Sequence, residues 1–345
     1  MTRNDRYRVL LATLIVASAA AVLFLMPLRK AEASFPSTTG KIAFTSDRTG
    51  GYGVHNPTKD SEIFVINPDG TGLTQLTSNE ADDYGPDYSA DGRRITFSSD
   101  RNGARRGTDD IFTMRADGSE QKNLTRTPSV DDSFPVWSPL GRGIAFTSFR
   151  NGNFEVYRMN ADGSRQKNLT ENPADDSIPA WSPKGDRIAF HSDRNGDYEI
   201  FAMKADGSDP KNLTRAPHSN EVIPEWSPDG GRVSFASDRA GSGFFVLDIF
   251  KMRYDGSDQE NLTETPNASE FFSSWSPDGE RIAFDSDRED PLSGNEDIFG
   301  MQADGSRQKK LSGTLPADDY SPSWQPGKEG WGDGEDRDGE GGEDD

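Results

Sequence analysis

The chain has 345 residues, enough for one large all-β domain or two domains of ordinary size. Its formal net charge is −21 and it contains no cysteine. This composition excludes disulfides, a thiol nucleophile and cysteine-ligated metals, and it argues against nucleic-acid and acidic-lipid partners. Cationic partners or divalent cations are favoured instead.

The first predicted element is an export segment, residues 1–33. Arginines precede an apolar run from Val9 to Leu28. Ala31-Glu32-Ala33 resembles the A-x-A cleavage site of a signal peptide, in which the flanking residues are small. The run is also long enough to span a bilayer, so a cleaved signal peptide and a retained N-terminal membrane anchor both stay open. Both interpretations predict an exported protein that is periplasmic, secreted or anchored at the outer face of the cytoplasmic membrane. Membrane contact is expected only through such an anchor.

A linker at 34–40 leads into an internal repeat at 41–327. Two aromatic positions recur together at intervals of about 45 to 50 residues, which indicates six copies of one unit. The first stands before a turn of the Ser-Pro-x-Gly type, at Tyr88, Trp137, Trp181, Trp226, Trp275 and Trp324. The second lies in segments like Ile-Ala-Phe-Thr-Ser-Asp, at Phe44, Phe97, Phe146, Phe190, Phe235 and Phe284.

Each copy predicts four short strands. After the first turn comes an alternating strand such as Arg187–Ser192, and the Asp-Arg-Asn-Gly hairpin signal at 193–196 follows it. A third strand is predicted at Tyr198–Met203, and a short fourth strand ends at Asn212-Leu213-Thr214 after an Ala-Asp-Gly-Ser turn. Four strands in each copy are typical of a propeller blade.

The two ends of the repeat predict a closed ring. The first copy opens at Lys41 with its second strand, and the chain ends the repeat at Tyr320–Trp324 with an inner strand. The last strand completes the first blade and removes free edges. The predicted fold class is therefore all-β: a six-bladed β-propeller of four-stranded antiparallel blades. Residues 328–345 are predicted to be a disordered acidic tail, solubilising, or alternatively calcium-buffering or partner-binding.

The repeat resembles the WD-type repeats of the TolB-like propeller family. The shared motifs are W-S-P-D-G, I-A-F-x-S-D-R-x-G, E-I-F-x-M and x-A-D-G-S-x-x-x-x-L-T, and they cover residues 41–327. The resemblance implies an envelope protein that docks a lipoprotein or a peptide at its propeller mouth. The protein is expected to be a monomer. TolB carries a globular domain before its propeller, whereas about seven residues separate Ala33 from Lys41, so the propeller alone is expected.

Acidic residues recur five positions before each inner aromatic residue. They are Asp83, Asp132, Asp176, Glu221, Glu270 and Asp319. In a propeller, this place lies where the chain crosses between blades, so the carboxylates could ring the channel mouth. Three interpretations stay open. The acids pair with the arginines of the Asp-Arg-x-Gly turns, they attract a basic peptide, or they bind Ca²⁺ or Mg²⁺. No other cofactor is predicted.

The hairpin between the second and third strands differs in length between copies. It is short in copies three and four and longer in copies five, six, one and two, which are consecutive around a closed ring. The longer loops would form a wall over one arc of the mouth. Tyr52, His55, Phe244 and Phe245 lie in or beside these loops and are the predicted aromatic contacts of a partner.

The sequence favours a protein-binding scaffold without enzymatic activity. Its three histidines, His55, His191 and His218, fall in two copies, and no G-x-S-x-G elbow is present. The alternative is a carbohydrate-active or metal-dependent enzyme on the same face, because related propellers include polysaccharide lyases. Acid pairs could serve glycoside hydrolysis, but the repeat offers many candidate positions and distinguishes none of them.

Overall fold

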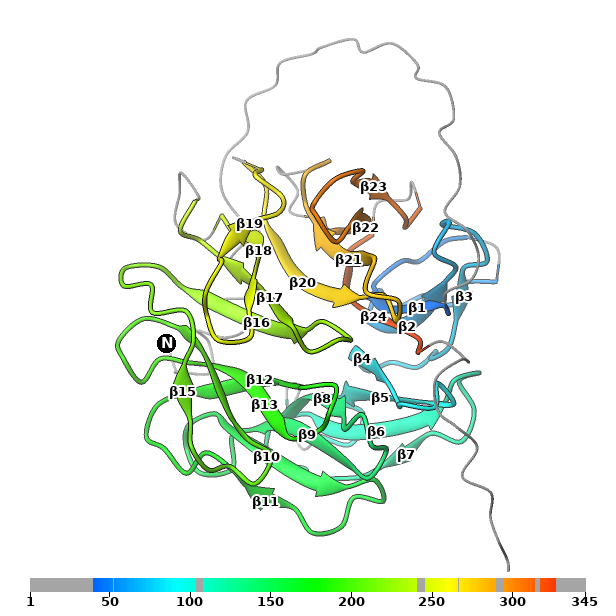
Figure 1. Cartoon of the computed structure of the whole chain (residues 1–345). Helices are drawn as coiled ribbons and strands as arrows, with labels where there is room; N and C mark the ends of the chain where they lie inside the picture. Colours follow the sequence, from blue (N-terminus) through cyan, green and yellow to red (C-terminus); the bar gives the residue numbers. More distant parts are fainter. Residues whose placement is uncertain are drawn as a thin grey trace, which may run out of the picture.

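The computed structural model describes residues 40–51, 53–103, 108–240, 246–265, 267–289, 295–313 and 317–326. These residues form six four-stranded antiparallel sheets, arranged as the blades of a ring (Figure 1). The predicted fold class is confirmed. The predicted leader, the acidic tail and all of the linker except Gly40 lie outside the described residues. Over the described ranges, no helix has the length and apolar character needed to cross a membrane.

Each blade is numbered here in chain order, with its strands given from the channel outward. The blades are blade 1, β24 (Asp319–Trp324), β1 (Ile42–Ser46), β2 (Glu62–Ile66) and β3 (Thr74–Gln75); blade 2, β4 (Asp83–Tyr88), β5 (Arg94–Ser99), β6 (Asp110–Arg115) and β7 (Lys122–Asn123); blade 3, β8 (Asp132–Trp137), β9 (Gly143–Ser148), β10 (Glu155–Asn160) and β11 (Lys167–Asn168); blade 4, β12 (Asp176–Trp181), β13 (Arg187–Ser192), β14 (Glu199–Lys204) and β15 (Lys211–Asn212); blade 5, β16 (Glu221–Trp226), β17 (Arg232–Ser237), β18 (Asp248–Arg253) and β19 (Glu260–Asn261); and blade 6, β20 (Glu270–Trp275), β21 (Arg281–Ser286), β22 (Asp297–Gln302) and β23 (Lys309–Lys310).

The ring closes as the repeat predicts. The last strand, β24, pairs antiparallel with the first, β1, and Trp324 lies opposite Ile42. This pairing joins the first and the last described strands within blade 1 (Figure 1). Blade 1 therefore has four strands like the other blades, although its strands come from both ends of the repeat.

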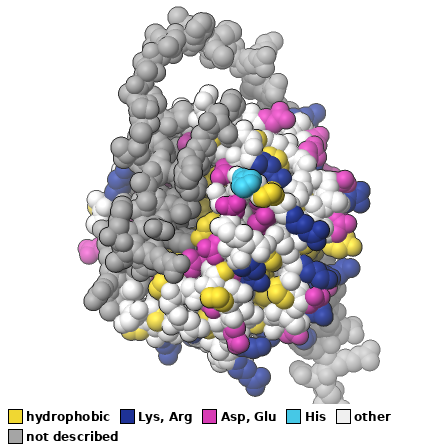
Figure 2. All heavy atoms as spheres, turned by 90° about the vertical axis from the view of Figure 1, so that its left-hand side faces the viewer, with side chains coloured by type: hydrophobic (Ala, Val, Ile, Leu, Met, Phe, Trp, Pro, Cys, Tyr) yellow, Lys and Arg dark blue, Asp and Glu magenta, His cyan; other side chains and the backbone are white. Residues whose placement is uncertain are grey.

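The hydrophobic core lies between blades. One buried cluster joins Ile200 of blade 4 to Trp226, Phe235 and Met252 of blade 5, and the same pattern recurs around the ring. The recurring aromatic and phenylalanine positions of the sequence are therefore the contacts between sheets. On the side of the ring shown in Figure 2, acidic and basic side chains are mixed and hydrophobic ones are scattered.

The Ala-Asp-Gly-Ser turns fix how closely adjacent blades approach. In blade 2, the Asp117 carboxylate accepts hydrogen bonds from the amide and the hydroxyl of Ser119, at 2.9 and 2.6 Å. Gly118 has φ of +87°, and a Cβ there would lie 2.6 Å from the carbonyl oxygen of Leu76 in blade 1. Both the left-handed backbone and the close approach require glycine at this place.

Two faces of the ring are distinguished below. The loop face carries the starts of the inner strands and the hairpins between second and third strands. The turn face carries the Ser-Pro-x-Gly turns. Each inner strand runs from the loop face to the turn face, so position along this strand gives depth in the channel.

Candidate binding site in the central channel

The six predicted acidic residues lie in buried ion pairs with the arginines of the Asp-Arg-x-Gly turns. Every acidic side chain is at most 1% exposed, and each arginine belongs to the same blade as its acid. The pairs are Arg48–Asp319 (2.5 Å), Arg101–Asp83 (2.5 Å), Arg150–Asp132 (2.8 Å), Arg194–Asp176 (2.9 Å), Arg239–Glu221 (3.0 Å) and Arg288–Glu270 (3.0 Å).

Each of these arginines also lies against aromatic rings of its own blade. The Arg150 guanidinium carbon is 4.5 Å from the ring centroid of Tyr157 and 5.7 Å from that of Phe146. The acids, the arginines and the rings therefore form one packed unit that recurs in every blade. This arrangement is the first of the three interpretations left open by the sequence.

In three of the six pairs, the arginine only partly offsets the cost of burying the carboxylate. Desolvation raises the pKa of Asp176, Glu221 and Glu270, although the adjacent arginine charge lowers it in each case. The six carboxylates differ from the expected open ring, because their side chains face arginine rather than the channel. A partner could reach them only by opening the pairs, and their role as partner contacts stays a prediction.

The predicted aromatic contacts are only partly described. Tyr52, Phe244 and Phe245 lie outside the described residues, whereas His55 is described and exposed. The backbone of His55 is fixed by Gln75, whose Oε1 accepts from the His55 amide at 2.7 Å and whose Nε2 donates to the His55 carbonyl at 3.1 Å. Partner binding by these four residues stays a prediction.

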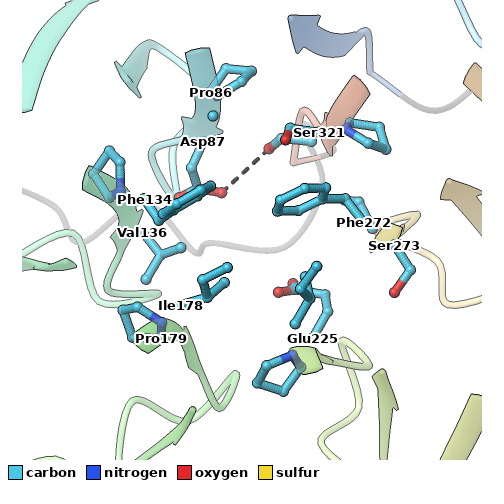
Figure 3. Close-up of a pocket in the computed structure, with 17 residues that line it drawn as sticks. Pro86, Asp87, Phe134, Val136, Ile178, Pro179, Glu225, Phe272, Ser273 and Ser321 are labelled. Atoms are coloured by element: carbon cyan, nitrogen blue, oxygen red, sulfur yellow. Dashed lines mark hydrogen bonds between the residues drawn. The ribbon is translucent and has the colours of Figure 1, made fainter. Parts of the chain in front are cut away.

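A cavity of about 80 Å³ occupies the channel, and all six inner strands line it (Figure 3). Its lining comes from the middle of each strand, between the start of the strand and the aromatic anchor. The lining residues are Gly85, Pro86, Asp87, Phe134, Pro135, Val136, Ile178, Pro179, Ile223, Pro224, Glu225, Phe272, Ser273, Ser274, Ser321, Pro322 and Ser323.

A β-bulge in each inner strand shapes this cavity. In blade 3, Phe134 and Pro135 both lie opposite Phe146, and Phe134 has φ of +51°. Ile178 and Ile223 have φ of +49° and +57° at the same place in blades 4 and 5, a region that β-branched residues rarely adopt. The bulge therefore stores backbone strain around the channel.

The preceding blade stabilises the strained residue. A side chain on its second strand accepts the backbone N–H of the bulge residue, which would otherwise be buried without a partner. The donor and acceptor residues are Gly85 and Thr45 (3.1 Å), Phe134 and Ser98 (3.0 Å), Ile178 and Thr147 (2.9 Å), Ile223 and His191 (3.3 Å), and Ser321 and Asp285 (3.3 Å). Burial lowers the pKa of His191 to about 3, so the ring stays neutral, and the Ile223 amide at Nδ1 assigns the proton to Nε2.

Blade 6 departs from this pattern for an identifiable reason. The residue that should accept its bulge amide is Ala236, which has no acceptor. The bulge is displaced by one residue, so that Phe271 and Phe272 lie opposite Asp285. The carboxylate of Asp285 accepts both amides, at 3.3 and 2.6 Å. Phe272 accordingly keeps an ordinary φ, unlike its counterparts in the other blades.

The displaced bulge places an aromatic pair across the channel. Phe272 stacks on Phe134 of the opposite blade, with ring centroids 5.9 Å apart and an interplanar angle of 19° (Figure 3). Tyr84 packs edge-on against Phe134 at 5.7 Å, and its hydroxyl donates to Asp109 at 2.6 Å. Tyr84, Phe134 and Phe272 are all partly exposed. They form an aromatic mouth on the loop-face side of the cavity.

Deeper in the channel, two acids face one another from blades 2 and 5. Asp87 accepts the Trp137 amide at 2.7 Å and the Ser323 hydroxyl at 3.3 Å. Glu225 lies across the cavity (Figure 3), and no described residue gives its carboxylate a hydrogen bond or an ion pair. Burial raises the pKa of Asp87 to about 7. Burial and the Asp87 charge raise the pKa of Glu225 well above its usual range.

Comparison with known proteins agrees with this geometry. The model of the TolB beta propeller domain matches residues 165–328. Among solved structures, TolB from Acinetobacter baumannii superposes with a TM-score of 0.68 at 20% identity, covering 85% of this chain and 68% of that chain. The putative TolB from Agrobacterium tumefaciens gives 0.60 at 18% identity, covering 84% and 100%. The propeller is TolB-like.

Sequence relatives of this TolB-like propeller align over shorter segments. An uncharacterized protein of Agrobacterium fabrum is 38% identical over 88 residues, which are 26% of this chain and 28% of the relative. The Tol-Pal system protein TolB of Geobacter sulfurreducens is 40% identical over 78 residues, 23% of this chain and 17% of the relative. The chain therefore aligns with less than a third of the length of either relative.

The TolB-like repeat also contains a sequence signal for the channel bulge. Proline stands two positions before the inner aromatic residue in five copies, and Ser273 replaces it in the sixth. Proline lacks an amide donor and marks a bulge in a strand. The exception in copy six coincides with the displaced bulge.

Metal binding stays a prediction for this propeller. Within the described ranges, no group of three or more His, Cys, Asp or Glu residues is arranged to hold a metal ion. Several described acids are instead held by arginine, by hydroxyls or by another carboxyl group. Glu296 is an example, because burial and the charge of Asp285 raise its pKa well above the usual range.

Proposed function

We propose that this TolB-like propeller is an exported scaffold that binds a protein partner at the aromatic mouth, and that it has no enzymatic activity of its own. The proposal draws on the TolB beta propeller match and on the similarity to the Tol-Pal system protein TolB of Geobacter sulfurreducens. A periplasmic location follows the same comparison and the predicted export segment. The partner is a protein or peptide, such as an envelope lipoprotein.

The aromatic mouth is the observation that carries the proposal. Tyr84, Phe134 and Phe272 are partly exposed around one opening, whereas the other repeated aromatic positions are mostly buried between blades. Aromatic side chains at the centre of a contact surface commonly supply most of the binding energy of a protein complex. Loops of unequal length around this opening would make the contact specific to one side.

The test is an affinity pull-down from envelope extracts of the source cells, with the tagged full chain and with Phe272→Ala. The expected result is a protein recovered by the unchanged chain and lost with Phe272→Ala. The matched control is Tyr254→Ala, because Tyr254 is 52% exposed and lies beside a turn away from the mouth. Equal recovery by all three chains would overturn the mouth as the binding site.

A second candidate function is carbohydrate lysis. Oligogalacturonate lyase in complex with manganese has a similar fold, with a TM-score of 0.51 at 15% identity, covering 73% of this chain and 71% of that chain. This likeness concerns the fold alone. His191 is engaged with Ser177 at 2.6 Å and with the Ile223 amide, so it would have to leave both to bind a metal. Release of unsaturated products from oligogalacturonate in the presence of Mn²⁺ would favour the enzyme.

A further inference from the structure

The channel below the aromatic mouth combines negative charge with an apolar wall. Asp87 and Glu225 are the titratable side chains among the described residues that line the cavity, and none of the lining residues is basic. The remaining wall is formed by prolines, by Val136, by Ile178 and by Ser hydroxyls. The two carboxylates therefore lack a cation, in contrast to the six acids that pair with arginine.

Two polar groups in this cavity lack partners. The Glu225 carboxylate receives no hydrogen bond from a described residue, and it is only partly buried because the cavity itself reaches it. The Ser321 hydroxyl is buried, with the residue 5% exposed, and also has no hydrogen-bond partner. Unsatisfied polar groups in a native structure are rare, and a donor that binds there would satisfy them.

We propose that the cavity receives the side chain of one lysine presented by the partner, with its ammonium group between Asp87 and Glu225. This inference rests on the proposed function and names the partner chemistry at the same site. An ammonium group has three donors and no acceptor, which suits two carboxylates and nearby hydroxyls. Its unbranched aliphatic stem suits the aromatic and proline wall.

The size of the cavity agrees with this occupant. A volume of about 80 Å³ holds a few water molecules or one slender chain, and it is small for a folded segment. The same cavity is lined by Phe134, Phe272 and the two acids, so a side chain inside it contacts the aromatic rings along its stem and the carboxylates at its tip. The aromatic faces also attract a passing cation.

The experiment measures binding of a short peptide to the isotope-labelled full chain by NMR. The probe is Ac-Gly-Gly-Lys-Gly-Gly-NH₂, and its control carries norleucine, which has the same stem without the charge. The Trp137 amide is the reporter because it donates to Asp87. We expect binding of the lysine peptide, at least about ten-fold weaker binding of the norleucine peptide, and a similar loss with Glu225→Gln or Asp87→Asn.

A surface substitution and a pH series complete the design. Glu280 is exposed, so Glu280→Gln removes the same charge without touching the cavity and should leave binding unchanged. Binding requires ionised carboxylates, and burial raises the pKa of both Asp87 and Glu225, so the affinity of the unchanged chain should rise from pH 6 to pH 8 by at least the roughly ten-fold expected from Asp87 alone. Asp285 and His191 lie behind the bulge, where each accepts a backbone amide of the inner strands.

Three results would overturn the proposal: equal affinity for the two peptides, no effect of either channel substitution, or no detectable binding. The pH series needs no substitution, so it stands even if a variant fails to fold. The assay also needs no natural partner. If the peptide does not bind but the pull-down recovers a partner, the proposed scaffold function stands and only the lysine proposal is overturned. If the lysine peptide binds specifically but the pull-down recovers no partner, the channel site stands and the proposed scaffold function loses its support.

Discussion

The substitution Arg150→Met tests whether the recurring ion pairs hold the blades together. Arg150 donates from one nitrogen to both Asp132 oxygens, at 2.9 and 2.8 Å, and the Asp132 side chain is 0% exposed. Methionine keeps much of the stem against Tyr157 but removes the charge. Asp132 would then retain the Thr127 hydroxyl, at 2.5 Å, without a cation.

The expected cost follows from what the carboxylate loses. Removing one partner of a buried ion pair commonly costs about 3–5 kcal/mol, because the other charge stays buried and unpaired. The lost contact between guanidinium and aromatic rings adds about 0.5–1 kcal/mol. Replacing Asp132 by Asn in the Arg150→Met chain should recover part of this loss, because the uncompensated charge is then absent.

Urea denaturation of the full chain at pH 7, followed by tryptophan fluorescence, measures the effect as a lower midpoint. Arg158→Met is the matched control, because Arg158 is exposed on the same blade and its bond to the Ala205 carbonyl is 3.3 Å long. Its effect should stay within about 0.5 kcal/mol. A loss below about 1 kcal/mol for Arg150→Met would refute the structural role and return Asp132 to the candidate partner contacts.

Three further predictions concern the channel and the turns. Burial raises the pKa of Asp87 from 3.8 to about 7, so ionisation of this carboxyl group destabilises the fold as pH rises between these values. Asp87→Asn should therefore increase the free energy of unfolding by up to about 4 kcal/mol at pH 8, seen as a higher melting temperature, and should have little effect at pH 4. Equal shifts of the melting temperature at both pH values would contradict this. Thr147→Val leaves a bulge amide without its acceptor and should cost about 1–3 kcal/mol in urea denaturation, whereas an unchanged midpoint would show that the bond is dispensable. Gly118→Ala should lower the urea midpoint more than Gly152→Ala, because both have positive φ but only Gly118 has a backbone oxygen 2.6 Å from the added carbon; equal losses would attribute the whole effect to φ.

The sequence was sufficient for the fold because the information repeats. The strand predicted at Arg187–Ser192 is β13 with the same bounds, and the strand predicted at Tyr198–Met203 is β14 displaced by one residue. Each turn or aromatic signal is weak evidence for a strand by itself, but its recurrence in six copies makes the prediction strong. Ring closure followed from an incomplete first copy, and β24 supplies the missing strand.

The environment of the acidic residues was harder to predict, because burial depends on neighbours from other parts of the blade. Asp132 and Arg150 are 18 residues apart, and only the register of β8 against β9 brings them together. A carboxylate at this place could equally have faced solvent. The one available signal was that acid and arginine occur together in every copy, which is what a contact within the blade requires.

The channel site was not predicted, because its residues occupy repeat positions at which the residue type differs between copies. A residue that is the same in all copies forms a sixfold ring, which presents the same side chain on every side of the channel. Asp87 and Glu225 occupy a place that is valine, alanine or serine in the other four copies, and they come from copies three apart, which puts them on opposite sides of the channel. The same reasoning applies to Ala236, whose missing acceptor displaces the bulge of blade 6 and brings Phe272 onto Phe134. Once the number of blades is known, differences between copies are therefore the part of a propeller sequence that carries information about a specific ligand, and the repeats themselves carry the fold.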